Sequence, residues 1–318
     1  MKYVFGAAAV ALALTATPIA LANESYPSEP LNYVIAFGPG GGNDLMSRTL
    51  VGILNQYDLY DRDISVENRD GGSGAVGFSY VKRQKGSPYF ATSTSGNFLA
   101  TPLVSNTDWT YADFTPVALL ASDAMFLVVS SDSGIETVDQ FVSAAKDGRV
   151  IVGGTGTAGP ERVVASLFAN AAGISFDYVP IGSGGELVTS LTSGSVSAIV
   201  ANPSEVSGQI AAGNFRALAF SDAERSTVYP EIPTFREQGY DFDFSLPRGM
   251  VLPGGVDAEI QAWWVKTLQE VVKTPEWQDY LKTNSMSGNP IWGAAFGAYL
   301  KETSAEFETV LREIGATQ

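Results

Sequence analysis

Short apolar runs rich in β-branched and aromatic residues alternate along this chain with segments whose apolar positions repeat every three to four residues. Such alternation is typical of α/β folds, in which a strand is followed by a helix that packs back onto the sheet. It predicts an α/β protein with largely parallel sheets. The expected strands are residues 31–37, 64–67, 89–94, 125–130, 150–153, 176–179, 199–201, 217–220 and 249–252.

The expected helices carry apolar stripes with helical spacing. The clearest follows the first strand and has its N-cap expected at Asn43 or Asp44. Two stripes near the C-terminus are rich in aromatic residues, and we interpret them as core and not as ligand surfaces. They consist of Ile260, Trp263, Trp264, Leu268 and Val271, and of Phe296, Tyr299, Leu300, Phe307, Val310 and Leu311.

The first residues have the pattern of a secretory signal peptide. Lys2 precedes an apolar run over residues 3–14, and a small-residue segment ends at Ala20-Leu21-Ala22. We expect cleavage near Ala22 and a mature chain that starts near Asn23 in the periplasm; an uncleaved membrane anchor is the alternative. Because the chain has no cysteine, disulfides and a lipid-carrying cysteine are excluded.

Length and linker composition together predict two domains. A mature chain of roughly 295 residues exceeds a typical single domain, yet no flexible linker separates two halves. We therefore expect the chain to cross twice between domains, near Ser122-Asp123 and near Leu246-Pro247. The expected first domain is discontinuous, with residues 23–122 and 248–318, and the second spans residues 123–247.

The amino-acid composition excludes several classes of function for this chain. With neither histidine nor cysteine, Ser-His-Asp and Cys-His catalysis and the usual zinc sites are excluded, and no cofactor or metal is expected. Hydrolysis by paired carboxylates remains formally open. The net charge of −15 makes nucleic acid and anionic lipid unfavourable partners. An anionic ligand would have to be held by local groups.

Four strand-to-helix junctions are rich in glycine: residues 38–42, 71–74, 153–159 and 182–185. Glycine lets backbone amides approach a ligand, and a following helix adds the positive end of its dipole. Such loops can bind an anion without a positively charged side chain. Any one of them could be only a tight turn, but four in one α/β chain favour a ligand site.

Residues 72–77 spell G-x-G-x-x-G after a strand, as in dinucleotide-binding folds. The next strand, however, ends without an acidic residue to bind ribose hydroxyls. No Gly-Lys pair is present, which excludes a phosphate-binding P-loop. We therefore predict no nucleotide site.

Polar side chains end one of the expected strands and follow another. Ligands of open α/β folds bind beyond the carboxyl ends of the strands, so these residues are candidates for ligand contact. They are Thr92, Ser93, Thr94 and Ser95, which end one strand, and Asn202, which follows another.

Two arginines are further candidates. Arg248, at the second expected crossing, could pair with a ligand carboxylate or form a surface ion pair with Asp241 or Asp243. Arg162 lies in the first turn of a helix, where a cation is unfavourable unless an anion is also present. Arg48 is interpreted as structural.

Several motifs in series resemble the substrate-binding proteins of tripartite tricarboxylate transporters, the Bug or TctC family. They are FGPGGGND at residues 37–44 with Arg48, VENR at 66–69 followed by the glycines of 71–77, YADFTPV at 111–117, GNFRALA at 213–219 and PEIPTFREQG at 230–239. The resemblance covers essentially the whole mature chain in the right order.

The resemblance implies a two-lobed, type II-like solute-binding fold in which one loop from each lobe holds a ligand carboxylate. The first loop corresponds to Phe37, Gly38, Pro39, Gly40, Gly41, Gly42, Asn43 and Asp44. The second lobe would contribute Thr155, Gly156, Thr157, Ala158 and Gly159, together with Gly182, Ser183, Gly184 and Asn202.

Arg248-Gly249 stands where relatives that bind citrate-like acids often have an Arg-Gly pair, which favours a di- or tricarboxylate. The chain departs from the family pattern at Gly38, where proline is common, and at Arg162, where histidine is common. A Tyr-Lys pair is also missing before Gly182. Positive charge is therefore distributed differently in the cleft.

The resulting prediction is an extracytoplasmic, monomeric protein that captures a small carboxylate and passes it to the membrane subunits of a tripartite tricarboxylate transporter, without catalysis. A sensor module that presents its ligand to a two-component kinase is one alternative. A carboxylate-based hydrolase is another, although Asp44 alone is a poor basis for it.

Overall fold

The computed structural model describes residues 26–148, 150–155, 159–182, 184–313 and 315–316. The expected signal peptide and its cleavage site lie outside these residues. Over the described part of the chain, no helix has the length and apolar character needed to cross a membrane.

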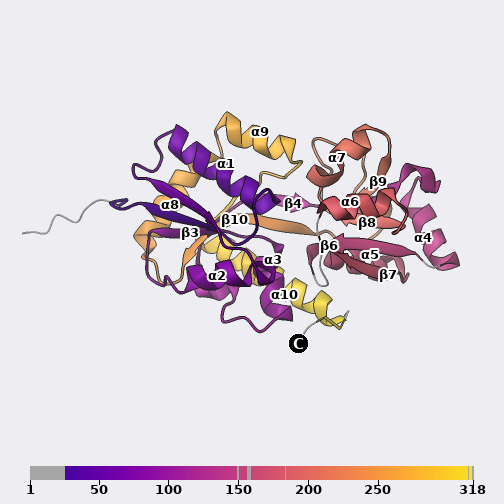
Figure 1. Ribbon diagram of the computed structural model, residues 1–318, viewed down its shortest axis with the longest axis horizontal. Coiled ribbons are helices and arrows are strands. Elements are labelled where there is room, and N and C mark those ends of the chain that lie inside the picture. The colour runs from indigo at the N-terminus through magenta and orange to yellow at the C-terminus, as the bar shows by residue number, and fades with distance from the viewer. Residues whose placement is uncertain (1–25, 149, 156–158, 183, 314, 317–318) are drawn as a thin grey trace, which may run out of the picture.

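The molecule has two lobes, each built on its own sheet with helices packed against it (Figure 1). The first lobe, at left in Figure 1, contains a sheet of strand order β11-β4-β10-β3-β1-β2. Its strands are β1 (Leu31–Ile35), β2 (Ile64–Asn68), β3 (Phe90–Ser93), β4 (Phe114–Ala124), β10 (Ser245–Pro253) and β11 (Ile291–Trp292).

The second lobe, at right in Figure 1, contains a sheet of strand order β7-β6-β8-β5-β9. Its strands are β5 (Phe126–Ser130), β6 (Ile151–Thr155), β7 (Asp177–Ile181), β8 (Ala198–Ala201) and β9 (Phe215–Phe220).

Ten α-helices are described, and they follow the alternation that the sequence predicts. They are α1 (Gly42–Gln56), α2 (Ala75–Lys82), α3 (Gly96–Val104), α4 (Val138–Asp147), α5 (Pro160–Ala172), α6 (Gly184–Thr192), α7 (Pro203–Ala211), α8 (Ala258–Val271), α9 (Pro275–Thr283) and α10 (Gly293–Glu313).

The expectation of largely parallel sheets is wrong, because both sheets are mixed. In the first, β1 is parallel to β2 and β3, but β10 runs antiparallel to β3 and β4, and β11 antiparallel to β4. In the second, β6 is parallel to β7 and β8, whereas β5 is antiparallel to β8 and β9. The antiparallel pairs involve the strands that enter or leave a lobe without a helical crossover.

The chain passes between the lobes along extended strands. It leaves the first sheet at Ala124, enters the second at Phe126, and joins the first sheet again at Ser245. Strands β4 and β10 pair side by side along this path. The crossing points expected from the sequence fall within these two strands.

Both aromatic stripes are part of the core, as predicted. Trp264, Leu268 and Val271 of α8 are buried in the first lobe, and so are Phe296 and Phe307 of α10. Toward its C-terminal end α10 also reaches the second lobe, where Nδ2 of Asn170 donates to Oε2 of Glu313 at 3.0 Å. Apolar burial of this extent is the main source of fold stability.

Strand β4 was missed in the sequence. Its residues Val117 to Ala121 are buried on both faces, so the run is continuously apolar and lacks the alternation that marks a half-exposed strand. Pro116 further weakened the strand signal. The N-cap expected for α1 was also wrong, since the helix is preceded by Gly41.

The G-x-G-x-x-G segment of the first lobe is explained by packing. It forms a single 3-10 turn, Gly72–Gly74, followed by α2. A Cβ at Gly77 would lie 2.5 Å from Cα of Ala36 and 2.8 Å from the carbonyl oxygen of Arg69. Glycine therefore allows α2 to lie directly against β1, and no nucleotide is needed to account for it.

We expect Gly77→Ala to lower the free energy of unfolding by about 1–3 kcal/mol, because the added methyl group meets backbone atoms that cannot move independently. Gly208→Ala is the matched control, since Gly208 lies in α7 with open space where its Cβ would be. That control should gain about 0.4–1 kcal/mol. Urea denaturation of both variants makes the comparison, and equal stability would refute the packing explanation.

Candidate ligand-binding cleft between the lobes

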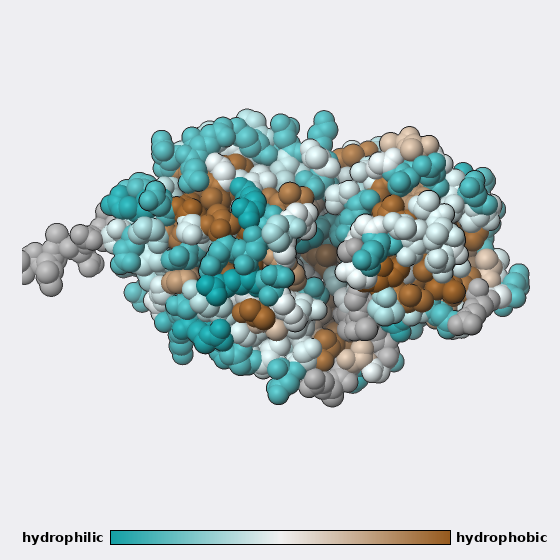
Figure 2. Space-filling view, in the orientation of Figure 1, coloured by the Kyte–Doolittle hydropathy of each residue, from teal (hydrophilic) through white to brown (hydrophobic). Residues whose placement is uncertain are grey.

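A cavity of about 410 Å³ lies where the two lobes face each other. Figure 2 shows the surface hollowed between them. The first lobe contributes Phe37, Ser73, Asn97, Ala100, Thr101, Val104 and Ser105, and the second contributes Thr155, Gly159, Ile181 and Gly182. Four of the residues predicted from the sequence, Phe37, Thr155, Gly159 and Gly182, therefore line one cavity from opposite sides.

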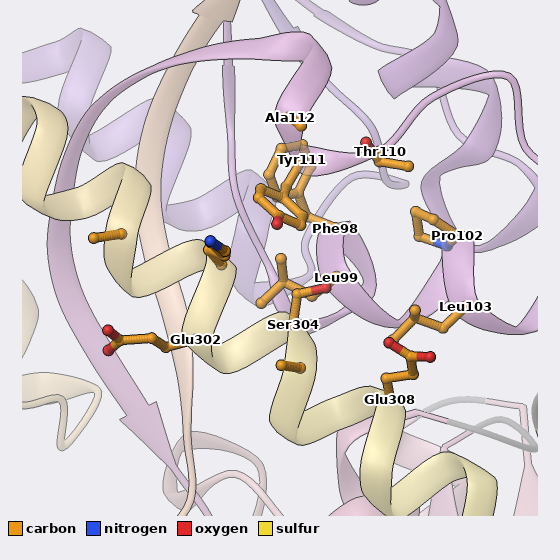
Figure 3. Close-up of a pocket in the computed structure, with 13 residues that line it drawn as sticks. Phe98, Leu99, Pro102, Leu103, Thr110, Tyr111, Ala112, Glu302, Ser304 and Glu308 are labelled. Carbon is orange, nitrogen blue, oxygen red and sulfur yellow. The ribbon is translucent and has the colours of Figure 1, made fainter.

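A larger groove, of about 720 Å³, lies within the first lobe between α3, Tyr111 and α10 (Figure 3). Leu99 and Leu103 face Ser304 and Glu308 of α10 across it. None of the predicted ligand-binding residues lines this groove. The smaller cavity is the better candidate site because it joins both lobes and contains glycine-rich loops from each.

The first glycine-rich loop is fixed by Asp44. The amide of Gly40 donates to Oδ2 of Asp44 at 2.9 Å, while Nε of Arg48 and Nδ2 of Asn68 donate to Oδ1 at 2.9 and 2.8 Å. Burial raises the pKa of Asp44, but these hydrogen bonds outweigh burial and lower it overall. Asp44 thus holds the loop, and the structural interpretation of Arg48 is supported.

The same loop exposes its backbone. Pro39, Gly40, Gly41 and Gly42 are solvent-exposed, and α1 begins at Gly42 without a side-chain cap. Gly40 has a φ of +83°, a conformation that favours glycine. Free amides at a helix N-terminus can bind an anion.

The polar residues at the end of β3 and directly after it lie behind this loop. The hydroxyl of Ser93 forms hydrogen bonds with the hydroxyls of Tyr33 and Ser47, at 2.6 and 2.8 Å. Oγ1 of Thr94 accepts from the amide of Gly249 at 2.8 Å. Nδ2 of Asn43 donates to the carbonyl oxygen of Thr94 at 3.0 Å, whereas Oδ1 of Asn43 and the hydroxyls of Thr92 and Ser95 are buried without partners in the described residues. These residues support the loop from inside the lobe.

Arg248 is buried in an ion pair with Asp123. The predicted alternative, a surface ion pair with Asp241 or Asp243, is therefore wrong. Its Nε and Nη2 donate to Oδ2 of Asp123 at 3.1 and 2.5 Å, and the side chain is 7% exposed. The two residues are diagonal neighbours, because Asp123 of β4 pairs with Leu246 of β10. Asp241 and Asp243 pair instead with Arg236.

The ion pair connects both lobes to the first loop. Nδ2 of Asn202, which precedes α7 of the second lobe, donates to Oδ1 of Asp123 at 2.8 Å. On the other side, a Cβ at Gly42 would lie 3.1 Å from Nη2 of Arg248. The predicted residues Asn202, Arg248 and Gly42 are therefore brought together by Asp123, which the sequence did not single out.

The second lobe places a buried glutamate beside the cavity. Glu161, in the first turn of α5, is 5% exposed. Oγ1 of Thr155 donates to its Oε1 at 2.6 Å, and its Oε2 has no hydrogen-bond partner in the described residues. Burial raises the pKa of Glu161 to about 7. The neighbouring Arg162 lies over the ring of Tyr178, at 4.5 Å from the ring centroid.

The remaining predicted residues lie along the second lobe's rim. The amide of Gly182 donates to Oε2 of Glu186 at 3.2 Å. A Cβ at Gly184 would lie 2.8 Å from Cδ of Glu205, whose carboxylate accepts from the amide of Asn202. The predicted residues Gly156, Thr157, Ala158 and Ser183 lie outside the described part of the chain.

The sequence missed three acidic residues and several cavity residues. Asp123 and Glu205 could have been suspected from a crossing strand and from the capping pattern N-x-x-E at Asn202. Glu161 directly follows a helix-initiating proline, a position that usually indicates only a favourable helix dipole. Asn97 carried no sequence signal, and Ser73 was noted only as part of the glycine-rich junction at residues 71–74.

Two sheet-based lobes with a cavity between them, lined by glycine-rich loops of both, form the architecture of a solute-binding protein. Residues 55–315 match the family model of the tripartite tricarboxylate transporter family receptor, TctC. The chain belongs to this family, as the sequence motifs predicted.

Individual proteins agree with this assignment. BugT of Bordetella pertussis is 28% identical over 258 residues, which cover 79% of this chain and 78% of BugT. A TctC solute-binding protein from Polaromonas, solved without ligand, superposes with a TM-score of 0.79 at 26% identity and covers 91% of this chain and 100% of its own. An R. palustris protein solved with adipate has a TM-score of 0.81 at 21% identity, covering 91% and 98%. The predicted two-lobed fold is confirmed.

We expect Asp123→Asn to destabilise the protein by about 3–5 kcal/mol, because it leaves the Arg248 guanidinium buried without a counter-charge. Glu270→Gln is the control, since Glu270 forms an exposed pair with Lys273; it should change stability by no more than about 1 kcal/mol. Denaturant unfolding at neutral pH measures both. Equal, small effects would mean that the buried pair does not hold the strands together.

Proposed function

We propose that this protein captures a small carboxylate in the cleft between its lobes and delivers it to the membrane subunits of a tripartite tricarboxylate transporter. The observation that carries the proposal is a cavity lined by both lobes, with Phe37 of the first glycine-rich loop among its lining residues. The same loop leads into the exposed N-terminus of α1, which lies beside Arg248. Family membership as a transporter-family receptor and the periplasmic relatives support it.

The chemistry of the first lobe suits a carboxylate. Gly41 and Gly42 are exposed at the start of α1, where unpaired amides and the helix dipole favour an anion. Nε and Nη2 of Arg248 are used by Asp123, but its Nη1 makes no hydrogen bond to described residues and lies 3.7 Å from the Cβ position of Gly42. Nη1 can therefore point a donor toward a ligand held at the loop.

The size and depth of the cavity suit a small acid. A volume of about 410 Å³ lies within the range of sites that bind small molecules. Each hydrogen bond to a charged carboxylate contributes about 1.5–3 kcal/mol. Three or four such bonds are sufficient for micromolar affinity, which needs about 8 kcal/mol, with some surplus against association costs.

Binding would favour closure of the cleft. Because the lining residues come from both lobes, a ligand makes more contacts when Thr155 and Gly159 approach the first lobe. A ligand shifts the equilibrium between the open and closed forms only by the difference between its binding free energies to the two forms. The closed, loaded form is the one we expect the transporter to recognise.

We expect Gly42→Val to weaken binding of the protein's acid by about tenfold or more, because the added side chain would cover the guanidinium of Arg248 and the amides beside it. Gly52→Val is the matched control: Gly52 lies in the same helix with open space around its Cβ position. A thermal-shift screen of organic acids, followed by calorimetry, identifies the acid and measures both variants.

An equal loss of affinity in Gly42→Val and Gly52→Val would indicate that valine disturbs helix α1 in general and not the ligand site. Stabilisation of the wild-type protein by neutral sugars or nucleotides, and by no organic acid, would contradict the proposed function.

A further inference from the structure

On the second lobe's side of the cleft, the carboxylates of Glu161 and Glu205 outnumber one arginine, Arg162, which lies over the ring of Tyr178. Glu161 is buried beside Thr155 and Gly159, which both line the cavity, and its Oε2 lies 3.0 Å from the Cβ position of Gly159. Glu205 lies next to Gly184 and is a second carboxylate on this side, so it does not neutralise the charge of Glu161. The nearby Arg248 is already paired with Asp123.

The helix N-terminus on this side is occupied by the chain itself. Helix α5 begins at Pro160, which has no amide N–H to offer, and the carboxylate of Glu161 lies in that first turn, held by Thr155. A ligand carboxylate placed there would meet the carboxylate of Glu161, which is unfavourable for two like charges. The two ends of the cleft therefore differ in the charge they favour.

We propose that the ligand carries an ammonium group as well as a carboxylate, and that Glu161 is the residue that recognises the ammonium group. The inference rests on the proposed function and names its substrate class: an amino-bearing acid and not a simple di- or tricarboxylate. In this arrangement the carboxylate binds at the start of α1 beside Arg248, and the ammonium group binds toward α5.

An ammonium group suits Glu161 better than a hydroxyl does. An ionised carboxylate only accepts hydrogen bonds, and Oε2 of Glu161 has no donor in the described residues. Leaving such an atom buried and unpaired is unfavourable. A ligand ammonium supplies both donors and the missing positive charge, so it would satisfy the carboxylate as a closed cleft excludes water.

The pH dependence has a definite sign. Burial raises the pKa of Glu161 to about 7, against the lowering effects of the Thr155 hydrogen bond and of Arg248, while the negative charge of Glu205 adds to the rise. The Tyr178 hydroxyl and Cβ of Glu161 both lie within 3 Å of the Cβ position of Gly154. A bound ammonium group favours the ionised form and lowers that pKa. Binding of an amino-bearing acid should therefore be strongest above about pH 7 and weaken as the pH falls below it.

The experiment compares acids that differ only in an amino group. Calorimetry on the purified mature protein measures L-aspartate against succinate, L-glutamate against glutarate, and 4-aminobutyrate against butyrate. We expect at least one amino-bearing acid to bind about tenfold more tightly than its partner, as one desolvated charged contact allows. This preference should shrink from about pH 8 to about pH 5.5 in the wild-type protein.

Glu161→Gln tests the assignment to this residue, because it keeps the shape and Thr155 contact but removes the charge. We expect it to abolish the preference while the deaminated acids bind as before. Glu259→Gln, an exposed change in α8, is the matched control and should keep the preference. Should Glu161→Gln fail to fold, the wild-type pH profile still decides the question.

Binding of acids without preference for the amino-bearing members, or affinity for dicarboxylates that rises on acidification, would overturn the inference and leave the proposed function standing. Dicarboxylate affinity that rises on acidification would mean that Glu161 is protonated and donates a hydrogen bond to a ligand carboxylate. Binding of no acid from the panel would contradict both proposals.

Discussion

The buried ion pair between Asp123 and Arg248 is the interaction on which the arrangement of this molecule depends. It joins the two strands, β4 and β10, along which the chain passes between lobes. Asp123 also accepts from Asn202 of the second lobe, while Arg248 lies against the start of α1. A buried pair is not in itself a large source of stability, but this one sets the position of the cleft's two walls relative to each other.

The two walls of the cleft differ in the charge of the groups that they carry. The first lobe presents exposed glycine amides, a helix N-terminus and an arginine Nη1, whereas the second presents Glu161 and Glu205. For a chain with a net charge of −15, attraction of an anion cannot come from the overall field and must come from these few oriented groups. The same asymmetry gives the cleft a direction, in which a ligand with opposite charges at its ends is favoured over one with like charges.

Much of this could be predicted from the sequence, for physical reasons. Glycine-rich junctions and alternating apolar runs depend on local geometry, so the described strands other than β4 and β11, the aromatic core and the first loop were found. The parallel-sheet expectation failed because strand direction depends on the crossing path, which no local pattern records. For Arg248, the ion-pair alternative named the wrong partners, since Asp123 is distant in sequence and only pairing of β4 with β10 brings the two together. Glu161 occupies a sequence position typical of a favourable helix-terminal acid, and only the structure shows that its Oε2 is buried with no partner among the described residues.

A crystal structure of the mature protein with its tightest-binding acid tests the central claim most directly. The account predicts a ligand between the lobes, with its carboxylate on the amides at the start of α1 and near Nη1 of Arg248, and with lining residues of both lobes in contact. A ligand in the groove between α3 and α10 (Figure 3), or one held by a single lobe with no contact to Arg248, would contradict it.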